Sequence, residues 1–201
     1  MSANKVPVES LRDRKRRQTR ERIIETAFAL FMERGFDVVT VDEIAQRAEI
    51  GRTTFFRYFG DKQEVVFSTE DDFLHALTAA MDDTPAEPLR DLARALATAR
   101  RLLRVICAEA ARNPGHHAVY HRLVTQHPEL EDRHTRKTRH YAELLEKHLT
   151  DHGTPTATAV LAAQLTIACY RTAWRLGGPD AAAVLREADH AFGLLLDVTA
   201  A

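Results

Sequence analysis

Apolar residues recur every three or four positions along most of this 201-residue chain, and this spacing places them on one face of an α-helix. An apolar stripe from Ile23 to Phe31 predicts a first helix that begins between Leu11 and Gln18 and ends at Gly35. Glycine suits that end because it readily adopts the left-handed backbone conformation of a C-terminal cap.

Two short helices are expected next. Thr40 and Glu43 have the spacing of a capping box, in which the threonine hydroxyl accepts from a backbone N–H and the glutamate reaches back. Only residues 49–51 separate this helix from an aromatic-rich segment over residues 52–59. Two short helices joined by a tight turn are a candidate helix-turn-helix. Within the second helix, Phe55 and Phe59 would face inward onto the first helix of the chain.

The rest of the chain shows the same helical period. Asp61 is expected to cap a helix that runs to about Met81, and further helices are expected over residues 85–111, 114–126, 128–152, 155–176 and 179–198. Alanine and leucine total 52 residues against 19 for valine and isoleucine, a balance that favours helix over strand. The sequence therefore predicts an all-α protein of about nine helices, with a three-helix helix-turn-helix domain followed by a larger helical domain.

The last two expected helices are apolar on more than one face. Between residues 157 and 173 the only charged residue is Arg171, so this helix needs cover on more than one side. The simplest arrangement is a homodimer in which both helices meet their symmetry mates in a four-helix bundle. The alternative is that both helices lie at the centre of a monomer. The residues expected at the dimer interface are Leu161, Leu165, Leu185, Ala188, Phe192 and Leu195.

Charge is segregated along the chain although its net value is −1. Residues 1–22 carry eight Lys and Arg against three acids, whereas residues 61–83 carry one Lys against seven acids. The basic segment can attract an anionic partner such as the phosphate backbone of DNA. The alternative is a solvated tail.

The sequence gives no sign of secretion or of a membrane segment. The first 22 residues hold no apolar signal-peptide core, and the apolar, uncharged segment over residues 157–170 is shorter than a bilayer-spanning helix. Cys107 and Cys169 cannot form a disulfide framework and suit a reducing compartment. We expect a cytoplasmic protein that does not contact a membrane.

Signatures of catalysis and of metal binding are also missing from the sequence. There is no glycine-rich phosphate loop and no GxSxG motif. The pairs His117/His121 and His148/His152 have an i, i+4 spacing that could hold a metal, but no cysteine pair or HExxH pattern accompanies them. We expect no enzyme, no catalytic residue, no cofactor and no metal site.

About a third of the chain, roughly residues 18–66, resembles the TetR family of bacterial regulators. The resemblance rests on Ala29-Leu-Phe-Met-Glu-Arg-Gly-Phe36, Thr40-Val-Asp-Glu-Ile-Ala45, Ile50-Gly-Arg-Thr-Thr-Phe-Phe-Arg-Tyr-Phe59 and Asp61-Lys62. It implies a basic flexible arm over residues 1–17, a helix-turn-helix DNA-binding domain over 18–60, and a ligand-binding and dimerisation domain over 61–201. It also implies a homodimeric repressor that binds a near-palindromic operator and is released by an apolar or amphipathic small molecule.

The start of the expected recognition helix carries side chains that can read bases. Arg52 can donate two hydrogen bonds to guanine, while Thr53 and Thr54 each offer a hydroxyl and a methyl group. The residues expected to contact DNA, some by chemistry and some by resemblance, are Thr40, Arg52, Thr53, Thr54, Phe56, Arg57, Tyr58 and Lys62.

The resemblance implies phosphate contacts from Thr40, Thr54, Tyr58 and Lys62. For the first and last of these, plain helix capping and a solvated charge are the alternatives. Two residues depart from the family pattern. Glu49 stands where glycine is most common, so a non-glycine residue would adopt a left-handed conformation. Phe56 stands where tyrosine is usual, so one hydroxyl contact to phosphate would be lost.

The resemblance also implies a small-molecule pocket walled by the apolar stripes of the middle helices. The candidate lining residues are Phe73, Leu77, Leu96, Leu103, Cys107, Tyr120, Leu123, Tyr141, Leu145, Cys169 and Trp174. Each of them could instead be ordinary core. The segment His127-Pro-Glu-Leu130 and the run at 54–59 resemble a subgroup with acyl-CoA-like ligands, which would place basic residues such as Arg100, Arg104 or Arg122 at the mouth of an apolar slot.

Two other functions remain open on the sequence. One is an all-α small-molecule carrier or enzyme, which predicts no sequence-specific DNA binding. The other is a constitutive DNA-binding protein without an effector, which predicts a DNA affinity that no small molecule alters.

Overall fold

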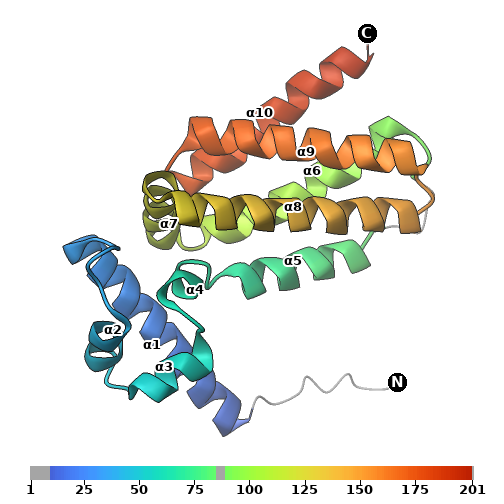
Figure 1. Ribbon diagram of the computed structural model, residues 1–201. Helices are drawn as coiled ribbons and strands as arrows, with labels where there is room; N and C mark the ends of the chain where they lie inside the picture. Colours follow the sequence, from blue (N-terminus) through green and yellow to red (C-terminus); the bar gives the residue numbers. More distant parts are fainter. Residues whose placement is uncertain (1–9, 85–88, 201) are drawn as a thin grey trace. The chain divides into compact units, whose positions relative to one another are not determined.

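The computed structural model describes residues 10–84 and 89–200, and within these ranges all regular elements are α-helices (Figure 1). The chain divides into two compact units, of which the first ends at Ser68 and the second begins at Thr69. The helices of the first unit are α1 (Leu11–Arg34), α2 (Val41–Arg47), α3 (Arg52–Tyr58) and α4 (Lys62–Val66). Those of the second are α5 (Glu70–Asp82), α6 (Leu92–Ala111), α7 (Pro114–Gln126), α8 (Pro128–Asp151), α9 (Thr156–Gly177) and α10 (Ala181–Ala200). The all-α prediction is confirmed. Within the same ranges, no helix combines the length and the apolar character needed to cross a bilayer.

The first helix includes part of the segment that was expected to be a flexible arm. Ser10 caps α1 by accepting a hydrogen bond from the backbone N–H of Asp13 at 3.1 Å. The helix thus begins at Leu11, within the expected range, so residues 11–17 of the expected arm are helical, while residues 1–9 lie outside the described part. A capping serine followed by several arginines and a lysine, which are good helix formers, accounts for this start.

The first unit is built around apolar side chains that all four of its helices bury. Ile23 of α1, Ile44 of α2, Phe55 of α3 and Val65 of α4 each have 0% exposed surface. The helices α2, α3 and α4 have seven, seven and five residues, too few for stable helices in water on their own. Their stability therefore depends on this shared apolar core.

A break interrupts the segment over residues 61–81 that was expected to form one helix. α4 ends at Val66 and α5 begins at Glu70, so the described residues contain ten helices where about nine were predicted. Ser68 lies in the break with 3% exposed surface, and its carbonyl accepts a hydrogen bond from Arg20 of α1. The Ser68 carbonyl thus binds a side chain of α1 instead of a backbone N–H of a further helical turn. The local apolar pattern does not show this contact.

The second unit is a helical bundle with a core rich in alanine and leucine. Leu96 of α6, Ala162 of α9 and Phe192 of α10 have 0% exposed surface, and α8 packs beside α9 (Figure 1). α9 and α10 approach each other closely at Gly177, where an added Cβ atom would lie 2.4 Å from the backbone nitrogen of Val184. Glycine is needed at this point because any side chain would collide with the backbone of α10.

Candidate nucleic-acid interface

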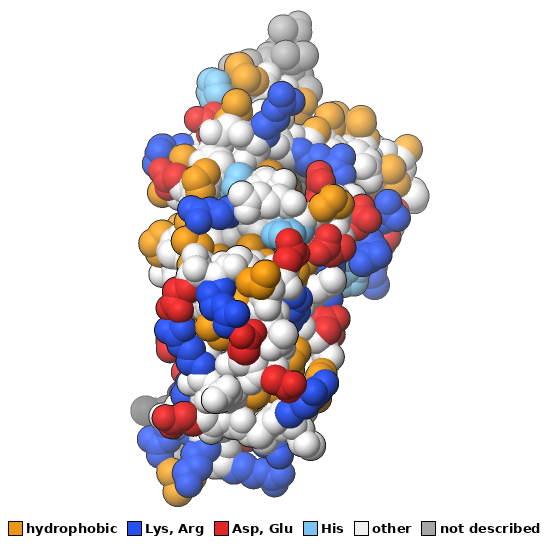
Figure 2. All heavy atoms as spheres, turned by 60° about the vertical axis from the view of Figure 1, so that its left-hand side comes forward, with side chains coloured by type: hydrophobic (Ala, Val, Ile, Leu, Met, Phe, Trp, Pro, Cys, Tyr) orange, Lys and Arg blue, Asp and Glu red, His pale blue; other side chains and the backbone are white. Residues whose placement is uncertain are grey.

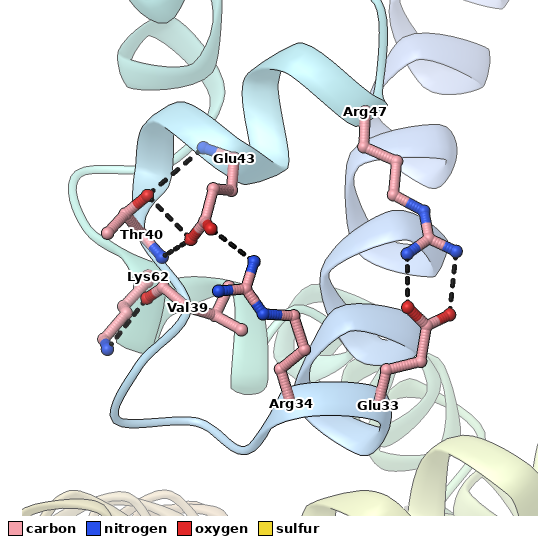
Figure 3. A network of polar contacts seen from close by, with 7 residues as sticks. All are labelled: Glu33, Arg34, Val39, Thr40, Glu43, Arg47 and Lys62. Carbon is pink, nitrogen blue, oxygen red and sulfur yellow. Dashed lines mark hydrogen bonds and ion pairs between the residues drawn. The ribbon is translucent and has the colours of Figure 1, made fainter.

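The start of α2 is fixed by a network of polar contacts (Figure 3). The Thr40 hydroxyl accepts a hydrogen bond from the Glu43 backbone N–H at 3.2 Å, and the Glu43 carboxylate accepts one from the Thr40 backbone N–H at 2.8 Å. The predicted capping box is confirmed. Arg34, in the last turn of α1, adds an ion pair with Glu43. The Thr40 backbone N–H, followed by Arg34 and the Thr40 hydroxyl, lowers the pKa of Glu43 to about 2, so the carboxylate stays ionised at neutral pH.

A second ion pair joins the other end of α2 to α1. Arg47 donates from Nη2 to Oε1 of Glu33 at 2.8 Å, and its Nη1 donates to the other carboxylate oxygen (Figure 3). Such a two-bond contact between guanidinium and carboxylate is directional, and the hydrogen bond from Arg47 lowers the pKa of Glu33. α2 is thus tied to the end of α1 at both of its own ends.

The turn between α2 and α3 contains the unusual backbone conformation that the sequence predicts. Glu49 has a φ of 53°, which lies in the left-handed region. A side chain in this conformation costs on the order of 1 kcal/mol. Across the turn, the Ile50 N–H donates to the Ala45 carbonyl at 3.0 Å, which fixes where α3 starts. The expected conformation of Glu49 is confirmed.

α3 turns one face to the core and the other to solvent. Phe55 and Phe59 are 0% and 4% exposed, so the prediction that both rings face inward is confirmed. The outer face has exposed side chains at Arg52, Thr53, Phe56 and Arg57, with half-buried ones at Thr54 and Tyr58. A short helix with a basic, hydroxyl-bearing outer face has the form of a recognition helix, whose side chains reach base edges in the major groove.

Arg52 is paired with an acidic residue that the sequence pattern did not indicate. Its Nη1 donates to Oδ2 of Asp42 at 3.0 Å, and its guanidinium carbon lies 5.6 Å from the centre of the Phe56 ring. Asp42 belongs to α2 and Arg52 to α3, so no spacing within one helix relates them. Their opposite charges at the starts of neighbouring helices are the signal that could have suggested the contact.

Lys62, the first residue of α4, has partners within its own unit. Its ammonium group donates to the carbonyl oxygens of Phe36 at 2.7 Å and Asp37 at 3.2 Å. It also donates to the carbonyl oxygen of Val39 at 3.1 Å (Figure 3). These bonds match the three N–H donors of an ammonium group. The phosphate contact predicted for Lys62 stays a prediction, and it would compete with the three carbonyl bonds that hold the loop between α1 and α2.

Basic side chains gather where α1 begins. Residues 11–18 are all exposed and include four arginines and Lys15. Figure 2 shows Lys and Arg side chains collected at the lower end of the view, which is the start of α1 in Figure 1. A helix carries these charges in a fixed register, which suits contact with a polyanion.

The residues expected to line a ligand pocket are mostly core of the second unit. Buried among them are Leu77, Leu96, Leu103, Cys107, Leu123, Leu145 and Cys169. Half-buried are Phe73, Tyr120, Tyr141 and Trp174. The buried residues could therefore contact a ligand only if the helices that pack together in this structure move apart and open a cavity.

Trp174 of α9 packs among rings from α7 and α8. The centre of its ring lies 4.7 Å from that of His134, which is stacked on it, and 4.6 Å from that of His121. The Tyr120 hydroxyl lies 2.7 Å from Nδ1 of His134. Burial lowers the pKa of His134 to about 4, so this imidazole is neutral at pH 7. The cluster joins three helices through neutral rings.

A groove of about 410 Å³ lies on α6 beside α10. It is lined by Ala97, Arg100, Arg101, Arg104, Val105, Ala108 and Leu185. Arg100 donates from Nε to Oδ1 of Asp189 at 3.0 Å, and Arg104 forms an ion pair with the same carboxylate. Of the three basic residues expected at the mouth of a ligand slot, Arg100 and Arg104 line this groove, whereas Arg122 does not. An apolar floor edged by arginines suits an amphipathic anion.

The residues expected at a dimer interface divide into exposed and buried positions. Ala188 and Phe192 are 1% and 0% exposed because α10 packs on α6 and α9, so their expected place at an interface is wrong. Leu161 is exposed, and Leu165, Leu185 and Leu195 are half-buried. Exposed apolar residues of α9 and α10 that the sequence pattern did not indicate are Val160, Leu176 and Leu194.

Comparison with known proteins shows what the first unit is similar to. Residues 23–69 match the family model described as bacterial regulatory proteins, tetR family. The chain is 40% identical over 76 residues to the HTH-type transcriptional regulator TcmR of Streptomyces glaucescens, a match that covers 38% of this chain and 34% of TcmR. It is 36% identical over 52 residues to the HTH-type transcriptional regulator HbdR of Aromatoleum sp., covering 26% of this chain and 23% of HbdR. The chain thus spans about a third or less of the length of these curated relatives.

Solved structures resemble the chain over most of its length. FadR of Thermus thermophilus, a TetR-family transcriptional repressor solved in complex with lauroyl-CoA, is 23% identical with a TM-score of 0.55, covering 88% of this chain and 93% of FadR. A TetR-like transcriptional regulator from Rhodococcus sp. RHA1 is 21% identical with a TM-score of 0.52, covering 90% and 96% of the two chains. These likenesses show a shared fold. Residues 23–69 of the first unit thus carry a domain of the tetR family of bacterial regulatory proteins.

Proposed function

We propose that the protein is a transcriptional regulator, most simply a repressor, that binds double-stranded operator DNA through α3. The observation that carries this proposal is the outer face of α3, where Arg52, Thr53 and Arg57 are exposed while Phe55 and Phe59 hold the opposite face in the core. Arginine can donate two bonds to guanine, and threonine offers a hydroxyl and a methyl group to base edges. Both side chains are therefore suited to reading a sequence in the major groove.

Phosphate contacts would set the position of α3 on the duplex without reading sequence. Thr54 and Tyr58 lie at the edges of the exposed face, and Thr40 and Lys62 stand at the starts of α2 and α4. The Thr40 hydroxyl donates to the Glu43 carboxylate at 2.9 Å, so a phosphate would have to replace that partner. We expect the phosphate contacts of Thr54 and Tyr58 to cost the protein less free energy than those of Thr40 and Lys62.

We assign dimerisation to α9 and α10. Leu161, Leu176 and Leu194 on these helices are 47%, 64% and 57% exposed, and exposed apolar side chains in this number suit a contact with a second copy of the chain. A two-fold symmetric dimer carries two copies of α3. They read successive major grooves when they are about 34 Å apart, so the operator would be near-palindromic.

We assign effector binding to the second unit as well, and we propose an apolar or amphipathic small molecule that releases the protein from DNA. The groove edged by Arg100, Arg101 and Arg104 supports this ligand class, because it combines apolar lining with cationic groups. The lauroyl-CoA bound to Thermus thermophilus FadR is a molecule of the same class. We propose that the protein acts in the cytoplasm, because the operator DNA that it would bind lies there.

The experiment that tests DNA reading is selection from a random DNA library by the full-length protein, followed by affinity measurements on the enriched operator and on random duplex. Arg52→Ala and Thr53→Ala should each weaken operator binding by about tenfold, because a base contact is worth roughly 1–3 kcal/mol, and should weaken random binding far less. Arg112→Ala removes an exposed arginine of the second unit and is the matched control. Equal losses on operator and random DNA would refute base reading by α3.

Native mass spectrometry of the purified protein tests the other two assignments together. It should show a dimer, which Leu161→Glu should convert to monomers, and any retained small molecule should weaken operator binding when it is added back. Failure to enrich any DNA sequence would favour a small-molecule carrier or enzyme. Operator binding that no retained compound changes would favour a constitutive DNA-binding protein.

A further inference from the structure

We propose that Asp42 is a specificity-determining residue, which together with Phe56 holds the Arg52 guanidinium in the orientation that reads a guanine. The inference rests on the proposed function of α3 and adds to it. The base-reading group then extends over both helices of the helix-turn-helix. Asp42 itself would be a positioning residue, since it acts on the base through Arg52.

Two contacts, one with a carboxylate and one with an aromatic ring, define the place of the guanidinium. Asp42 accepts from Nη1 of Arg52 at 3.0 Å, and the Phe56 ring lies 5.6 Å from the guanidinium carbon. The Phe56 ring is held in turn by an edge-to-face contact with Phe55, whose centroid is 5.6 Å away at an interplanar angle of 86°. Because Phe55 is fully buried, this chain of contacts connects an exposed arginine to the core.

The backbone brings the acid and the arginine together. Asp42 lies in the first turn of α2, and Arg52 is the first residue of α3. The turn that relates the two helices contains Glu49 in its left-handed conformation. The distance between Asp42 and Arg52 therefore depends on the fold of the whole helix-turn-helix.

The ion pair has little to contribute to folding. Arg52 and Asp42 are 65% and 62% exposed, and exposed pairs of this kind add about 0–1 kcal/mol to stability. The guanidinium carries five N–H donors in a rigid fork, and the bond to Asp42 leaves donors for O6 and N7 of guanine. An arginine that is already oriented loses less side-chain entropy when it docks on a base.

The charge of Asp42 gives the proposal a distinctive signature. A carboxylate close to the DNA-reading surface repels phosphates, so its removal should strengthen binding to random DNA by about two- to fivefold through charge alone. Loss of the orienting contact should weaken guanine selection at the position that Arg52 reads by about fivefold or more. The two effects have opposite signs, which a merely unfolded or merely less acidic variant would not show.

The test uses full-length Asp42→Asn on the selected operator, on its single-base variants and on random duplex. Glu25→Gln, which removes one negative charge from an exposed position of α1, is the matched control and should leave the base preferences unchanged. In an Arg52→Ala background, Asp42→Asn should no longer change base preference. Far-UV circular dichroism should show both variants folded, since asparagine has the size of the aspartate that it replaces and the Thr40–Glu43 box is untouched.

The possible results separate this inference from the proposed function. If the wild-type protein selects an operator but Asp42→Asn keeps the same base preferences, the role of Asp42 is overturned while DNA reading stands. If Asp42→Asn changes preference equally with and without Arg52, the effect does not pass through Arg52 and the proposal is again overturned. If the wild-type protein selects no sequence, the proposed function fails, and the role of Asp42 fails with it.

Discussion

The two units of the molecule differ in what accompanies their apolar cores. In the first unit, the short helices α2, α3 and α4 share an apolar core with α1, and polar contacts at defined points add to it, such as the capping box of Thr40 and Glu43 and the pair of Arg47 with Glu33. In the second, helices of up to 24 residues pack through a broad apolar core. Polar ties demand particular residues at particular positions, whereas an apolar core tolerates exchange among residues of similar volume.

This difference accounts for where the chain resembles its relatives. The family model matches residues 23–69, which is the part with specific caps, ties and turn conformations. Beyond it, solved structures at 21–23% identity share the arrangement of helices. The first unit thus has a recognisable sequence, whereas the second shares only its fold with these solved structures.

The largest expected effect tests the packing of the second unit. Gly177→Ala should destabilise it by about 3 kcal/mol, because the new Cβ would lie 2.4 Å from the backbone nitrogen of Val184 and the helices would have to move apart. Urea unfolding followed by the fluorescence of Trp174, the single tryptophan of the chain, reports on this unit. Gly193→Ala in α10 is the control, since its Cβ would meet nothing within 4 Å, and it should stabilise by about 0.5–1 kcal/mol. Equal effects of the two variants would contradict the close approach.

A smaller effect is expected from pH, and it too should fall on the second unit. The pKa of His134 is about 4 in the folded protein because burial disfavours the charged imidazole, against about 6.5 when it is exposed. The unfolded chain therefore binds a proton first as the pH falls. Stability is fully present above pH 6.5 and is lost progressively towards pH 4, by about 2 kcal/mol between pH 7 and pH 5.

Urea titrations at several pH values, again followed by Trp174 fluorescence, measure this loss. His134→Gln keeps a polar partner for Tyr120 and should flatten the dependence, at the expense of stability at pH 7. His140→Gln, at an exposed position of the same helix, is the control and should leave the dependence as it is. A wild-type protein equally stable at pH 5 and pH 7 would contradict a buried neutral His134.

The smallest expected effect tests a polar tie of the first unit. Lys62→Met keeps the aliphatic stem but removes the bonds to three carbonyl groups, which should cost about 1.5 kcal/mol. Far-UV circular dichroism should show the loss, while Trp174 fluorescence should not. If Lys62 also contacts a phosphate, the salt dependence of DNA binding should fall by roughly one unit of slope. If the slope of the salt dependence is unchanged, Lys62 does not contact a phosphate and only holds the loop between α1 and α2.

Much of the first unit could be read from the chain because its determinants lie close together in sequence. Thr40 and Glu43 are three residues apart, Phe55 and Phe59 four, and Glu49 stands in a turn between two recognisable helices. Contacts over such separations depend on the local helix geometry, which is the same in every protein. The capping box and the inward rings were therefore predictable from local spacing, and the left-handed conformation of Glu49 from the resemblance to the TetR family.

The tertiary structure decided the features that depend on contacts between distant residues. Arg20 of α1 binds the Ser68 carbonyl in the break after α4, and α10 buries Phe192 within its own unit. The pairing of Asp42 with Arg52 likewise joins two helices whose relative placement no periodicity encodes. The apolar pattern determined which residues form helices and which face is buried. Only the packing of those helices against one another decided which apolar residues remain exposed and which acid meets the arginine proposed to read DNA.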